Sequence, residues 1–223
     1  AAMTELTYAD PTGGAPFLWR HLDANAPDAR NWLSTQSGIP PTAVRALIAT
    51  ETRPRTERFD GGALINLRGL GTDPETDLDP LVSIRLWAAA GLVVSVTYRE
   101  LAGLDALRED MKAGRLRDPG DLVSMLAVHI TERLDPHVAQ LGDTIDDCEE
   151  RLSASEAFAL RRVIGRTRSD AIIYRRFVSP QRQALEALAA LECGWLDDLD
   201  RVHLRDVADR FARMAEELES IRE

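Results

Sequence analysis

YRRFVSPQR, residues Tyr174–Arg182, lies in the middle of a helical pattern that ends near Leu191. Apolar residues recur every three or four positions through this pattern. Beside them, arginines recur every seven positions, at Arg161, Arg168, Arg175 and Arg182. This periodicity predicts an amphipathic helix that buries one apolar face and belongs to a helical last hundred residues.

A second helical pattern follows Gly194 and covers Trp195–Glu223. Its apolar stripe consists of Leu196, Leu199, His203, Val207, Phe211, Met214, Leu218 and Ile221. At 1.5 Å per residue the helix would be roughly 45 Å long. No Gly or Asn stop signal follows the last apolar position, so we expect the helix to continue in a longer parent protein.

A third helical pattern, Asp121–Leu152, precedes a turn signal at Ser153–Ser155. We therefore predict an acidic helical hairpin over residues 119–193, followed by a long C-terminal helix from residue 194 onward.

The preceding residues, 15–118, alternate strand and helix signals. Asp60-Gly61-Gly62 between two β-rich runs predicts a hairpin, because glycine accepts the positive φ of a tight turn. The expected strands are Phe17–Leu22, Arg53–Phe59, Ala63–Arg68, Leu81–Trp87 and Gly91–Tyr98, and the expected helices are Pro27–Ser34, Pro41–Ala49 and Leu101–Ala113. The predicted class is α+β with α/β/α layers: a mixed sheet of four to seven strands flanked by helices. Residues 1–14 are expected to be a tag remnant and flexible N-terminus.

Composition excludes several classes of protein. The formal net charge of −10 argues against generic nucleic-acid binding. Cys148 and Cys193 lack CxxC spacing and fit a reducing compartment. No apolar run approaches the roughly 20 residues of a membrane helix, so the residues present are expected to be soluble and cytoplasmic.

Catalytic and resident-cofactor motifs are absent from the sequence. It contains no phosphate-binding glycine loop in a strand–loop–helix context, no GxSxG and no HExxH. We therefore expect no enzyme activity and no bound organic cofactor.

Four carboxylates share one face of the first hairpin helix. They are spaced i, i+3, i+4 and i+7, at Asp143, Asp146, Asp147 and Glu150. Like charges at this spacing repel, so either a cation or arginines on a neighbouring helix should offset them. An antiparallel hairpin would place Asp146 and Asp147 opposite Arg161 and Arg162, which keeps both interpretations open.

Three stretches, in this order, together resemble one family. They are Glu51–Arg55 leading into Phe59–Arg68, Val82–Trp87 leading into Gly91–Thr97, and Tyr174–Arg182. The set resembles the N-terminal cytoplasmic domain of CorA-type divalent metal ion transporters, and within that family the ZntB-like zinc transporter branch. The resemblance covers roughly residues 15–223.

The resemblance implies a homopentameric funnel at the cytoplasmic face of the inner membrane, with transmembrane helices and a Gly-x-Asn loop beyond residue 223. Zinc would be the transported or regulatory ion, with magnesium, cobalt or nickel as alternatives. Trp195–Glu223 would be the cytoplasmic part of the stalk, with Asp197 and Asp200 among the carboxylates that hold cations. Assembly, cation attraction and ion-dependent gating would be the tasks of the domain. The competing hypothesis is a soluble helical oligomerisation module with no transport role.

Overall fold

The computed structural model describes residues 2–50, 52–75, 79–151 and 157–222, and its centre is one mixed β-sheet. The strands are β1 (Met3–Tyr8), β2 (Phe17–Asp23), β3 (Arg55–Phe59), β4 (Gly62–Leu70), β5 (Leu81–Ala89) and β6 (Leu92–Thr97). Their order across the sheet is β1-β2-β6-β5-β4-β3. Only the β2–β6 pair among them is parallel. The expected glycine turn joins β3 to β4, with Gly61 at φ +82°.

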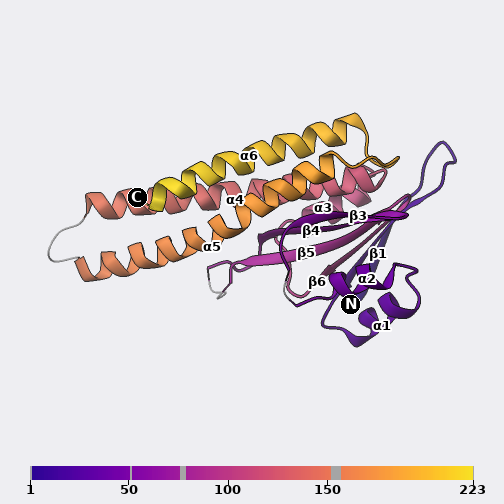
Figure 1. Ribbon diagram of the computed structural model, residues 1–223, viewed down its shortest axis with the longest axis horizontal. Helices are drawn as coiled ribbons and strands as arrows, with labels where there is room; N and C mark the ends of the chain where they lie inside the picture. Colours follow the sequence, from indigo (N-terminus) through magenta and orange to yellow (C-terminus); the bar gives the residue numbers. More distant parts are fainter. Residues whose placement is uncertain (1, 51, 76–78, 152–156, 223) are drawn as a thin grey trace.

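Helices cover both faces of this sheet (Figure 1). On one face lie the short helices α1 (Pro27–Thr35) and α2 (Pro41–Leu47), which enclose a small apolar core. On the other lie α3 (Leu104–Lys112), α4 (Pro119–Glu150), α5 (Ala157–Ala189) and α6 (Asp198–Arg222), which share a larger core. The predicted α/β/α class is confirmed, and six strands fall within the expected range.

The N-terminal residues are the first correction to the sequence-based expectation. Met3–Tyr8 is not part of a flexible tail but pairs antiparallel with β2, from Met3 opposite Leu22 to Tyr8 opposite Phe17. Leu6 and Tyr8 are partly buried against the larger core. Leu6 and Tyr8 alternate with polar residues, which is a local strand pattern.

Tyr174–Arg182 lies in α5 where this helix contacts both the sheet and α6. The inward face consists of Tyr174, Phe177, Val178 and Gln181, all at most 2% exposed. Gln181 bonds the backbone of β4 like a strand partner: its Nε2 donates to Arg68 O at 2.7 Å, and its Oε1 accepts from Arg68 N at 2.9 Å. The stretch therefore holds α5 on the sheet.

Aromatic rings join the three long helices. His137 of α4 meets Tyr174 edge-on at 5.6 Å between ring centroids, and Phe177 of α5 meets Phe211 of α6 at 6.1 Å. Because Phe211 is fully buried, this seam makes α6 part of the domain core.

The beginning of α6 differs from the prediction. The helix starts at Asp198, not Trp195, because Asp197 occupies the N-cap position. Leu199, assigned to the apolar stripe, is 59% exposed, and Asp200 takes the inward position with 3% exposure. The turn expected at Ser153–Ser155 lies outside the described residues.

Candidate functional site

Three carboxylates gather where α4 and α6 begin. Asp118 and Asp121 belong to the start of α4, and Asp200 belongs to the first turn of α6. One oxygen from each lies within 4.8 Å of the others. Within the part of the chain that the structure describes, this is the one group of three or more acidic, His or Cys side chains close enough to share a metal ion.

Helix capping explains how the local sequence builds this cluster. Asp118 caps α4, accepting a hydrogen bond from Asp121 N at 2.8 Å, and Pro119 follows at the first helical position. At the start of α6, Asp197 Oδ1 accepts from Asp200 N at 2.8 Å, while Asp200 Oδ2 accepts from Asp197 N at 3.2 Å. The second arrangement is a reciprocal capping box with Asp in place of Glu.

Gly120 permits the two helix starts to approach. A Cβ at this position would collide with Asp200 Oδ2 and with the main-chain carbonyl oxygen of Trp195. A larger residue at position 120 would therefore push α6 off α4 and open the cluster.

Burial sets the electrostatics of the cluster. The pKa of Asp200 is raised to about 7, chiefly by burial and in part by the neighbouring carboxylates Asp121 and Asp197, while a hydrogen bond from Asp197 N opposes the shift. Burial also raises the pKa of Asp118. Arg117 offsets part of the negative charge, because its Nε donates to Asp121 at 3.2 Å.

The arrangement allows two kinds of chemistry. Asp200 can exchange a proton near neutral pH, and in its protonated form it can share that proton with Asp121. Carboxylate oxygens at this separation are also the donors that a hard divalent cation prefers.

The four carboxylates predicted on the α4 face are all exposed. They are Asp143, Asp146, Asp147 and Glu150, and they share the outward side of α4 while Ile145 and Cys148 point inward. Asp147 pairs with Arg151 at 3.3 Å, one turn along the same helix. The structure records no ion pair from Asp146 or Asp147 to Arg161 or Arg162 within the described ranges.

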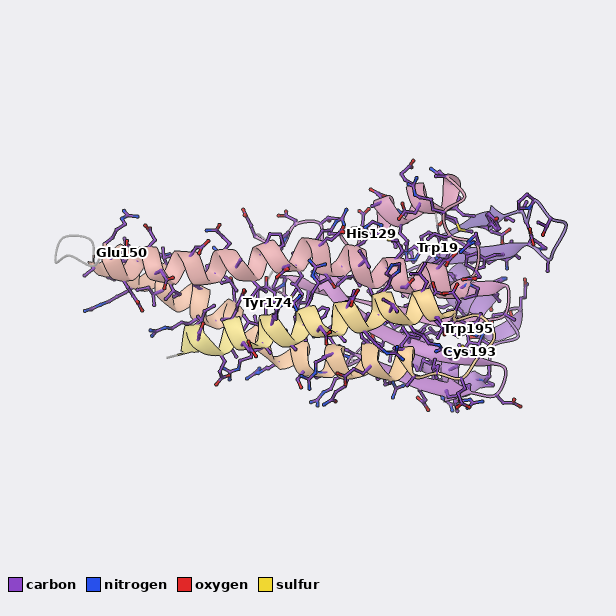
Figure 2. All side chains as sticks on the ribbon, turned by 90° about the horizontal axis from the view of Figure 1, so that it is seen from above. Trp19, His129, Glu150, Tyr174, Cys193 and Trp195 are labelled. Atoms are coloured by element: carbon purple, nitrogen blue, oxygen red, sulfur yellow. The ribbon has the colours of Figure 1, made fainter. Side chains whose placement is uncertain are left out.

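The two predicted acidic groups lie at opposite ends of the long helices. Asp143 follows Asp121 by 22 residues on α4, roughly 33 Å along the axis. Figure 2 shows Glu150 at the tip farthest from the sheet, and Trp195, near Asp200, at the sheet end. Asp197 is exposed, so of the two α6 predictions only Asp200 enters the buried cluster.

Asp118 and Asp121 were not among the predicted residues. The dipeptide Asp118-Pro119 is a local signal for a helix start and would have identified the cap. The proximity of Asp118 to Asp200 is a tertiary effect, because 82 positions separate these two aspartates in the sequence.

None of the helices in the described part of the chain is long and apolar enough to cross a membrane.

Comparison with known proteins provides a family context. The family model described as "CorA-like Mg2+ transporter protein" matches residues 14–223. Over 211 residues the chain is 33% identical to the "Divalent cation transporter CmaX" of Pseudomonas aeruginosa, which covers 92% of this chain and 63% of that protein. It is 28% identical over 203 residues to the "Zinc transport protein ZntB" of Pectobacterium carotovorum, covering 91% of this chain and 62% of the relative. The chain therefore spans less than two thirds of these relatives.

Solved structures have the same fold. A full-length CmaX structure superimposes with a TM-score of 0.85 at 26% identity, covering 98% of this chain and 72% of that one. The ZntB cytoplasmic domain of Vibrio parahaemolyticus superimposes with a TM-score of 0.80 at 19% identity, covering 99% of this chain and 92% of that one.

Proposed function

This chain belongs to the CorA-like Mg²⁺ transporter family, and we propose that it is the N-terminal cytoplasmic part of a transporter that carries divalent cations across the inner membrane. The observation that carries the proposal is the family match over residues 14–223. Members of this family are transporters and not enzymes, so the sheet and helices here serve transport and not catalysis.

Zinc is the ion that we propose first, with magnesium, cobalt and nickel as alternatives. Support comes from the relatives: one is named for zinc and one for divalent cations, while the family description names magnesium. In this proposal the same ion is transported and also regulates transport by binding at the acidic positions.

For those positions we propose two roles. The exposed α4 face of Asp143, Asp146, Asp147 and Glu150 would concentrate cations near the surface, since a cluster of one charge sign raises the local concentration of counter-ions. Asp197 would add to this attraction at the other end of the domain. Asp200, with Asp118 and Asp121, would bind a hard cation, and binding would change the position of α6.

Calorimetric titration of Zn²⁺ and Mg²⁺ tests the α4 face. A variant with Asp143, Asp146 and Asp147 changed to Asn and Glu150 to Gln should lose heat relative to the unchanged chain. A matched control removes four exposed acids elsewhere: Asp28, Asp60 and Asp73 to Asn, and Glu75 to Gln. Equal heats in all three proteins would remove the α4 face from the proposal.

Self-association into a homopentamer is the assembly that we propose. Apolar side chains on the outer surfaces of the long helices support it, among them Leu199 at 59%, Val202 at 47% and Ile172 at 44% exposure. Light scattering after gel filtration should show an oligomer that Leu199→Asp with Val202→Asp disrupts. A monomer at all concentrations tested would contradict self-association of this part of the protein.

Ion flux through the full-length parent protein in liposomes is the decisive test of transport. Zn²⁺ or Mg²⁺ entry above that of empty vesicles is the expected result. Absence of flux for all four candidate ions would favour the alternative, a helical oligomerisation module.

A further inference from the structure

Arg85, in the middle of β5, is a buried cation with unused hydrogen-bond donors. The residue is 3% exposed. Its Nη2 donates to Ala49 O at 2.6 Å, and its guanidinium lies over the Tyr98 ring at 5.2 Å from the centroid. Its Nε and Nη1 are buried and have no hydrogen-bond partner among the residues that the structure describes.

These atoms leave three N–H groups without an acceptor, one on Nε and two on Nη1. Buried polar groups in folded proteins are nearly always paired, and a buried charge is costly unless it is compensated. The Tyr98 ring stabilises the positive charge of Arg85 through the face of the guanidinium. It does not pair the N–H groups, because they point outward in the plane of the guanidinium. The unpaired donors therefore indicate a missing acceptor.

Arg85 lines a cavity of about 320 Å³ at the end of the sheet, where α2 ends and β5 begins. Thr50, Arg68 and Asp79 line this cavity and also the next one, of about 520 Å³. Arg68 further lines a third cavity of about 470 Å³, which reaches Arg176 on α5. Because the three cavities share lining residues, they are neighbours on this part of the surface, and we treat them together as one groove.

Arginines dominate this groove, which we call the arginine groove. They are Arg85, Arg99, Arg68, Arg53 and Arg176. Among the described lining residues, Asp79 is the one acidic side chain. Burial lowers the pKa of Arg85, Tyr98 raises it, and the charge of Arg68 lowers it again. A protein of net charge −10 thus concentrates positive charge at one place, which favours an anionic ligand.

We propose that the arginine groove binds a small molecule that carries two or more phosphate groups. Guanidinium groups match the geometry of phosphate oxygens and donate several hydrogen bonds to them. Each of the three cavities is lined by at least two arginines, so the groove offers more cationic groups than a single phosphate would use. This ligand is distinct from the transported cation and independent of the transport proposal.

Isothermal titration with pyrophosphate, at physiological salt, tests the assignment. The unchanged chain should bind about one equivalent, with saturation below about 1 mM. Arg85→Gln should weaken binding by at least about tenfold, because it removes charge-assisted donors. Arg53→Gln, at an exposed position in the same groove, should weaken binding by about fivefold without affecting folding. The Arg53→Gln variant therefore still tests the site if the Arg85→Gln variant does not fold.

Arg58→Gln is the matched control, because Arg58 is exposed on the neighbouring strand β3, has the same charge and lies outside the groove. Its affinity should stay within about twofold of the unchanged chain. If the Arg58 and Arg53 variants lose the same affinity for pyrophosphate, the loss reflects net charge alone, and the proposed site is wrong. Absence of saturable binding would overturn it as well. Citrate binding as tightly as pyrophosphate would overturn the phosphate assignment.

Discussion

Asp200→Asn should change the pH dependence of folding in a defined direction. The pKa of Asp200 is about 7 in the folded protein, against an ordinary value of 3.8. Between these pH values the folded protein holds a proton that the unfolded chain has released. The contribution of Asp200 to stability is therefore complete below about pH 3.8 and is lost as the pH rises toward 7.

The magnitude follows from the width of this window. One pH unit corresponds to about 1.36 kcal/mol for one proton, so a window of about three units amounts to about 4 kcal/mol at most. Asn imitates the protonated carboxyl group and can still accept the hydrogen bond from Asp197 N. The variant should therefore be more stable than the unchanged chain above pH 7, and this advantage should shrink by about 1.4 kcal/mol per pH unit toward pH 4.

Urea unfolding of both proteins at pH 5, 6, 7 and 8, in buffers with EDTA, measures this difference. Titrating groups outside the Asp200 cluster are common to the two proteins and cancel in the comparison. A difference that does not vary between pH 5 and 7 would show that Asp200 is already ionised in the fold, and would refute the argument from burial. Repeating the series with Mg²⁺ tests the cation proposal, since a bound cation should stabilise only the chain that keeps the carboxylate.

Three further predictions concern the same core. Gly120→Ala should cost about 1–3 kcal/mol by overpacking the α4–α6 contact. Gly142→Ala on the same helix is the control, because an added Cβ there meets nothing within 4 Å. It should be neutral or stabilising by up to about 1 kcal/mol. Equal changes in the free energy of unfolding for the two variants, measured with urea, would contradict the steric argument. Phe211→Ala should cost about 3–5 kcal/mol in the same assay, and a loss below about 1 kcal/mol would place Phe211 outside the core. Burial lowers the pKa of His21 to about 4, so its contribution to stability is present above about pH 6.5 and is lost as the pH falls to about 4. His21→Gln should flatten this acid-side loss in pH-dependent unfolding, and an unchanged slope would assign the loss to other groups.

Short-range patterns were sufficient to predict most of the fold. The β-branched residues of β5 and β6, the Gly61 turn and the 3.6-residue spacing in α5 each correspond to observed elements. These signals are local, because they depend on side-chain direction and on turn conformation within a few residues. The one strand that was missed, β1, had the same local signal but was set aside as a tag.

The candidate sites were less predictable, because they depend on contacts between distant segments. Spacing placed four carboxylates on one face of α4 but could not reveal that Asp200 would meet Asp118 and Asp121. Nor could it reveal that Arg85, in a largely apolar strand, would be buried with its Nε and Nη1 unpaired among the described residues. Both features arise only when the helices dock on the sheet.

The close contact at Gly120 fixes how α6 can move. A slide of α6 along its axis would drive Asp200 or the Trp195 carbonyl into α4, so the helix start acts as a clamp. The helix is about 37 Å long, so a tilt of about 5° at this contact would have to move its far end by about 3 Å. A change at Asp200 that tilted α6 would therefore require the buried side chains along the helix, Phe211 and Leu218 among them, to repack against their neighbours.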